Sequence, residues 1–152
     1  MAMVITSETM FVEGWNFVQQ IVHRTAEEKG WWKNDLKDLA AKITETWDTD
    51  LIDGSTDLGK LLSMIKNLPD REIGTLIALQ HSELSEGLEY VRMGNPQDDK
   101  IPEFTGLEAE FADVVIRIMD VAHHNKLNVV GAILAKVAMN KTRAYKHGGK
   151  EF

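Results

Sequence analysis

Two pairs of acidic residues in this chain share one spacing, Glu83 with Glu86 and Glu110 with Asp113. At i, i+3 spacing, both carboxylates of a pair lie on one face of a helix. Two such helices packed antiparallel would bring four carboxylates to one hard cation, and Mg²⁺ favours oxygen ligands together with water and substrate phosphates. The pairs therefore indicate a magnesium site for phosphate chemistry. The alternative is a solvated acidic face, because Glu and Asp are usually exposed.

A line of basic and amide side chains near the end of the chain could bind the phosphates. Lys136, Asn140 and Arg143 follow one another at helical spacing, and an ammonium, an amide and a planar guanidinium suit triphosphate oxygens. The alternative is a solvent-facing basic end of a helix, which the helix dipole favours.

A third group of residues could recognise a base. Trp15, Gln19 and His23 recur at i, i+4 spacing, and Trp31 and Trp32 follow shortly after. Aromatic side chains stack on bases and a glutamine can hydrogen-bond to a base edge. A tryptophan stripe is also typical of a core, so both readings stay open.

The elements that must position these residues are helices, because helical periodicity is widespread and alternating strand patterns are lacking. The pattern predicts an all-α bundle with helices over residues 8–29, 33–47, 58–68, 71–93, 106–124 and 128–147. Asp70 is predicted to cap the fourth helix. Arg117 could pair with Asp113 at i, i+4.

Apolar stripes predict which helix faces are buried. The stripe of the fourth helix comprises Ile73, Leu76, Ile77, Leu84, Leu88 and Val91. That of the fifth comprises Leu107, Phe111, Val114 and Ile118. Glu110 and Asp113 lie on the flank of the fifth-helix stripe, and Glu83 borders the fourth-helix stripe, whereas Glu86 lies further around.

The composition indicates one domain spanning residues 1–152. A hydrophobic share of 43% and a charged share of 27% are typical of a globular protein. The chain has no cysteine, so disulfides and thiolate chemistry are excluded. No apolar run approaches the roughly 18 residues of a membrane span, and a secretory leader pattern is lacking, which favours the cytoplasm and no membrane partner. A net charge of −7 argues against a nucleic-acid polymer as partner.

Together these motifs resemble the MazG-like all-α nucleoside triphosphate pyrophosphohydrolases. The resemblance is carried by the two acidic pairs with a spacer of 23 residues, the segment KVAMNKTRAYKHGGKEF, and His23 with the run EKGWW. It covers most of residues 8–30 and 72–150, and residues 33–70 depart from it as an additional helical segment.

The resemblance implies hydrolysis of a nucleoside triphosphate, usually a deoxy or non-standard one, to the monophosphate and pyrophosphate. It implies that the four acids hold one or two Mg²⁺ ions, with Mn²⁺ as a substitute, and that Glu86 or Glu83 acts in catalysis. Lys136, Asn140, Lys141 and Arg143 would bind phosphate, and Gln19, His23, Trp31 and Trp32 would bind the base. A homodimer or homotetramer is expected.

Two other classes compete with this reading. A di-iron carboxylate bundle needs two Glu-x-x-His motifs, whereas the chain offers only Asp120-x-x-His123 as an approximate match. A non-enzymatic helical protein-interaction module would explain the tryptophans and the acidic balance through partner contacts.

Overall fold

The structure is a computed structural model that describes residues 6–46, 53–68 and 71–143, and this part of the chain is all-α. The helices are α1 (Ser7–Glu28), α2 (Asp35–Thr46), α3 (Asp57–Lys66), α4 (Ile73–Arg92), α5 (Gly106–His124) and α6 (Val129–Lys141). Within these ranges, the only β contact is an isolated antiparallel bridge between Gln97 and Thr105. The predicted fold class is confirmed. None of the described helices is long and apolar enough to cross a bilayer.

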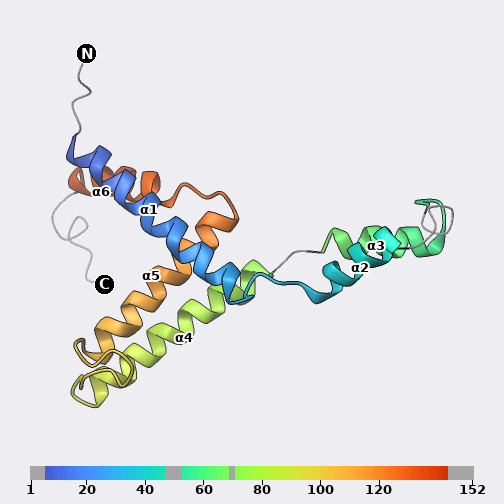
Figure 1. The fold of residues 1–152 in the computed structure, drawn as a ribbon. Coiled ribbons are helices and arrows are strands. Elements are labelled where there is room, and N and C mark those ends of the chain that lie inside the picture. The colour runs from blue at the N-terminus through green and yellow to red at the C-terminus, as the bar shows by residue number, and fades with distance from the viewer. Residues whose placement is uncertain (1–5, 47–52, 69–70, 144–152) are drawn as a thin grey trace.

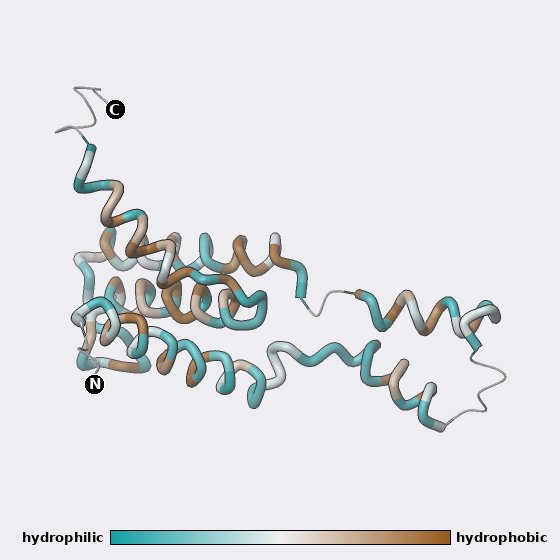
Figure 2. The backbone as a smooth tube through the Cα atoms, turned by 90° about the horizontal axis from the view of Figure 1, so that it is seen from above, coloured by the Kyte–Doolittle hydropathy of each residue, from teal (hydrophilic) through white to brown (hydrophobic). Residues whose placement is uncertain are grey.

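The helices form a bundle with a projecting arm. α4 and α5 make an antiparallel hairpin, α1 packs across α5, and α6 lies against α1 (Figure 1). α2 and α3 pack on each other and extend away from the other helices in both views (Figures 1 and 2). We call this α2–α3 hairpin the arm. It is the form taken by the additional helical segment predicted near residues 33–70.

Side-chain caps explain where most helices begin. Thr105 accepts a hydrogen bond from the Glu108 N–H, and the Glu108 carboxylate accepts one from the Thr105 N–H, which completes a capping box for α5. The predicted cap of α4 is wrong, because α4 begins at Ile73 with Glu72 as its N-cap; Asp70 itself lies outside the described residues. α6 ends at Lys141, six residues earlier than predicted.

The loop between α4 and α5 fixes how the two helices face each other. Gly94 has a φ of +85°, a left-handed conformation that favours glycine. The buried Asp98 carboxylate accepts two backbone N–H bonds of 2.9 Å within the loop and a 3.3 Å bond from the Tyr90 hydroxyl. The Tyr90 ring lies directly on Gly106, where an added Cβ would come within 2.0 Å of it. These contacts hold α4 and α5 together at the loop end of the hairpin, about one helical turn from Glu110.

The predicted core face of α4 is mostly wrong for the single chain, whereas most of the predicted face of α5 is half-buried. α4 turns Leu76, Glu83 and Gly87 towards the interior. Leu76 belongs to the stripe that was predicted to be buried, but the other members of that stripe are exposed, namely Ile73, Ile77, Leu84, Leu88 and Val91. On α5, Phe111 is 52% exposed, whereas Leu107, Val114 and Ile118 are half-buried. Periodicity identified these stripes correctly as apolar, but α5 covers a neighbouring face of α4.

Candidate metal centre

Three of the four predicted acids meet where α4 and α5 pack together. Glu83 of α4 and Glu110 and Asp113 of α5 each offer one carboxylate oxygen, and the three oxygens lie within 4.8 Å of one another. Glu83 and Glu110 are buried, whereas Asp113 is exposed. We call these three residues the acid triad. It joins one member of the first acidic pair to both members of the second.

A glycine on α4 allows the two helices to approach at the triad. Gly87 is buried one turn after Glu83, and a Cβ added there would lie 3.3 Å from a Leu107 methyl carbon and 3.5 Å from the Glu110 Cβ. A larger residue would push the helices apart at this height. Gly87 therefore brings Glu83 within reach of the α5 carboxylates.

The triad has the electrostatics of crowded carboxylates. The pKa of Glu110 is raised from its ordinary value of 4.5 to about 7, first by burial, then by a hydrogen bond with Glu83 and by the negative charges of Glu86, Glu83 and Asp113. The pKa of Asp113 is also raised, by burial and by Glu83, although the nearby Arg117 opposes the change. Both shifts mean that the metal-free site resists carrying its full negative charge.

The triad residues fit a hard divalent cation. All of the donors are carboxylate oxygens, the ligands that Mg²⁺ and Ca²⁺ prefer. One buried oxygen, Glu110 Oε2, has no hydrogen-bond partner among the described residues. A cation would satisfy this acceptor and relieve the repulsion that raises the pKa of Glu110.

The remaining predicted ligand, Glu86, lies beside the triad. Its side chain is exposed and accepts a 3.3 Å hydrogen bond from Ser82. Its charge nevertheless reaches the triad, because it is one cause of the raised pKa of Glu110. The structure thus gives Glu86 a solvent-facing position at the rim of the site.

Arg117 forms an ion pair with Glu83 across the two helices, rather than with Asp113 in its own helix as the sequence suggested. The guanidinium Nε is buried and has no hydrogen-bond partner in the described part of the chain. One member of the acid triad is therefore held by a cation that belongs to the protein.

A buried polar cluster continues the same line of α5 beyond Arg117. Asp120 is buried, and its Oδ1 lies 2.6 Å from His23 Nδ1 of α1 and accepts a 2.8 Å hydrogen bond from Trp32 Nε1. The Trp32 ring stacks on His124 with centroids 3.7 Å apart. The Arg71 guanidinium lies 5.4 Å from the centre of Trp32. This cluster fastens α1 and the segment after it to α5.

The four predicted base-binding residues make different contacts within the described part of the chain. His23 and Trp32 hold Asp120, and the Gln19 Oε1 accepts a 2.7 Å hydrogen bond from Trp15. Trp31 is exposed and lines a cavity of about 20 Å³, which is room for about one water molecule. Base binding by these residues therefore stays a prediction.

The predicted phosphate-binding line lies on a different part of the bundle from the triad. α6 packs against α1, and Figure 1 shows it away from α4. All four of the residues concerned are exposed, namely Lys136, Asn140, Lys141 and Arg143. Among the described ion pairs, none links them to the acid triad.

Comparison of the chain with protein-family models, with curated proteins and with solved structures found no match.

Sequence reasoning missed the roles of Arg117 and Asp120, although a signal was present. Glu110, Asp113, Arg117 and Asp120 follow one another at spacings of three or four residues, which places them on one side of α5. A polar line of that length beside a buried face indicates a paired network rather than a solvated surface. What the sequence could not supply is which residues of α1 and α4 face it.

Proposed function

We propose that the protein uses Mg²⁺ to hydrolyse a nucleoside triphosphate to the monophosphate and pyrophosphate. The proposed substrate class is a deoxy or non-standard nucleotide. The acid triad is the observation that carries this proposal. Three converging carboxylates fit a divalent cation, and one of them has a buried oxygen without a hydrogen-bond partner among the residues that the structure describes. The triphosphate is an anion that such a cation attracts.

In the proposed reaction, Glu83, Glu110 and Asp113 hold the cation. A bound Mg²⁺ would polarise the α-phosphoryl group and lower the pKa of a coordinated water. Glu86 remains exposed at the rim, so its carboxylate is available to orient or deprotonate the attacking water. Few covalent tasks fall to the protein, because positioning and charge stabilisation dominate phosphoryl transfer.

A homo-oligomer is part of the proposal. The exposed α4 stripe presents five large apolar side chains in one row, and contiguous apolar patches of this kind mark interaction sites. A second copy covering the stripe would also explain how the basic line of α6 could serve a triad that it does not reach in its own chain. Light scattering should give a dimer or tetramer, and Leu84→Glu should shift it towards monomer.

The same stripe favours the alternative, a non-enzymatic interaction module that binds another protein. The discriminating measurement is Mg²⁺-dependent pyrophosphate release across a panel of standard, deoxy and modified triphosphates. The proposal expects release from at least one of them, and expects Glu83→Gln to lower kcat by about 100-fold or more.

Glu89→Gln is the matched control for that experiment. Glu89 lies on the same helix, is exposed, and pairs with Arg92, so its loss should leave turnover unchanged. Absence of release from every nucleotide, or equal activity of the Glu83 variant and wild type, would reject the pyrophosphohydrolase assignment.

A further inference from the structure

Arg117 is placed to act on both a cation and an anion. Its guanidinium pairs with Glu83, a member of the acid triad, so that a cation binding there must compete with it for the carboxylate. The Glu83 side chain is 9% exposed and that of Arg117 is 35% exposed. Arg117 is therefore the more solvent-accessible partner of the pair.

The ion pair leaves hydrogen-bonding groups of opposite kinds unused. Arg117 Nε is a buried donor without a partner, and Glu110 Oε2 is a buried acceptor without one, considering only the residues that the structure describes. Buried polar groups are normally paired. An unused acceptor suits a cation and an unused donor suits an anion, so the two together match a metal ion bound to a phosphate.

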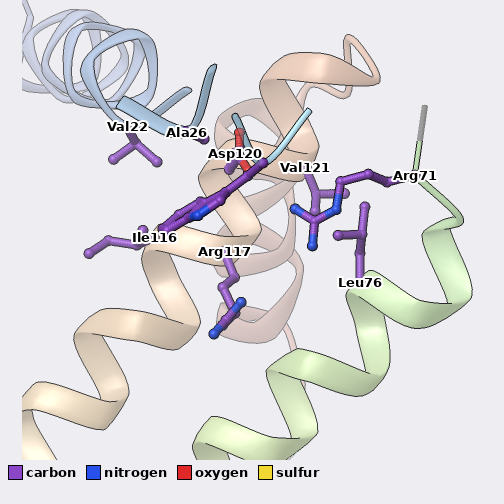
Figure 3. Close-up of a pocket in the computed structure, with 9 residues that line it drawn as sticks. Val22, Ala26, Arg71, Leu76, Ile116, Arg117, Asp120 and Val121 are labelled. Carbon is purple, nitrogen blue, oxygen red and sulfur yellow. The ribbon is translucent and has the colours of Figure 1, made fainter. Parts of the chain in front are cut away.

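The surroundings of Arg117 also favour an anion. Arg71, at the approach to α4, lines the same small cavity as Arg117, and Figure 3 shows both side chains in the space between α4 and α5. The carboxylate in this cavity, Asp120, is already engaged by His23 and Trp32. Among the described ion pairs, Asp120 is joined to His23 and to neither guanidinium, so it does not neutralise the charge of Arg117.

We propose that Arg117 is an internal counter-ion, which holds Glu83 in the metal-free protein and transfers to a phosphate oxygen of the substrate when a divalent cation takes Glu83. The proposal deepens the function proposed above and depends on it for the identity of the anion. Arg117 would supply in this chain the phosphate contact that the distant α6 line does not reach. The exchange keeps the buried Glu83 carboxylate paired with a cation in both states.

The first test measures Mn²⁺ binding by calorimetry without nucleotide, in wild type, Arg117→Met and Arg92→Met. Loss of the competing charge should make Arg117→Met bind Mn²⁺ about tenfold more tightly. Arg92 pairs with Glu89 away from the triad, so its variant should match wild type. A merely structural Arg117 would predict weaker Mn²⁺ binding in the variant, and unchanged or weaker binding overturns the proposal.

The second test measures binding of an α,β-imido triphosphate with saturating Mn²⁺. Arg117→Met should bind it about 10- to 100-fold more weakly, the effect of one lost charge-assisted hydrogen bond. Equal affinity would overturn the phosphate contact. Tighter Mn²⁺ binding by the variant without hydrolysis of any triphosphate by wild type would instead support the counter-ion and reject the proposed function.

A third measurement on the wild-type protein covers the case in which the variant does not fold. The Arg117 Nε–Hε NMR signal, found by comparing spectra with and without Arg117→Lys, should shift on adding Mg²⁺ and shift again on adding the analogue. If the chemical shift of this signal does not change at saturating Mg²⁺, the ion pair between Arg117 and Glu83 persists, and this result overturns the proposal.

Discussion

Glu110 should make the metal-free protein less stable as the pH rises towards neutrality. Its pKa is about 7 in the folded chain, against an ordinary value of 4.5, so the folded state binds more protons than the unfolded state between these two values. Stability falls with pH wherever the folded state binds more protons. The stabilising contribution of the neutral side chain is therefore complete below about pH 4.5 and is lost as the pH rises to about 7.

The size of this effect follows from the displacement of the pKa. A change from 4.5 to about 7 corresponds to about 3 kcal/mol at most. We expect about 1–2 kcal/mol, because Asp113 and Glu86, two of the charges responsible, are exposed and screened by water and salt.

Glu110→Gln isolates the effect, because glutamine stays neutral at every pH. At pH 5 the variant and wild type should unfold at similar urea concentrations in EDTA. At pH 8 the variant should be more stable by about 1–2 kcal/mol. Glu89→Gln, an exposed substitution on α4, should follow wild type throughout. Protein concentration is kept fixed, because an oligomer has concentration-dependent stability.

Mg²⁺ provides the complementary measurement. A cation replaces the proton on Glu110, so saturating Mg²⁺ should stabilise wild type more at pH 8 than at pH 5 and should stabilise the variant less. A stability difference between wild type and Glu110→Gln that stays constant from pH 5 to pH 8 would refute the reasoning, since it would show that Glu110 does not change its protonation in this window.

The other predictions concern the packing that holds the site. Gly106→Ala should lower the free energy of unfolding in urea by about 1–3 kcal/mol, because its Cβ would collide with the Tyr90 ring. Gly87→Ala should lower it less, because the nearest neighbour of its Cβ would be 3.3 Å away. The reverse order would contradict the packing described. Asp120→Ala should lower the free energy of unfolding by about 1–3 kcal/mol, because two buried partners lose their acceptor. Unfolding followed by tryptophan fluorescence tests this, and a neutral effect would show that the cluster does not hold α1.

The helices were predictable because their signals are local. The Thr105 cap with Glu108 three residues later marks the start of α5, and the predicted range of this helix agrees with the structure. The α4 start was misplaced, because Glu72 serves as N-cap without a side-chain hydrogen bond, so no capping residue type marked it.

The pairing across helices was not predictable to the same degree. The spacing of Glu83, Glu110 and Asp113 correctly indicated carboxylates that converge. It did not show that Arg117 would form an ion pair with Glu83 on α4 rather than with Asp113 on its own helix. Which pair forms depends on the distance and register at which α4 packs on α5. Close approach at Gly87 sets this register, and a single glycine in a helical pattern gives little warning of it.

The arm has a consequence for how the chain folds. The His23–Asp120 contact joins residues 97 positions apart, so the arm lies inside the loop that α1 closes when it docks on α5. Loop-closure entropy grows only with the logarithm of length, and the arm's share of this loop adds roughly 0.4 kcal/mol. The α4–α5 hairpin can form from neighbouring segments before that closure. The length of the arm thus hardly slows the docking of α1, and lengthening, shortening or replacing it should leave the assembly of the acid triad intact.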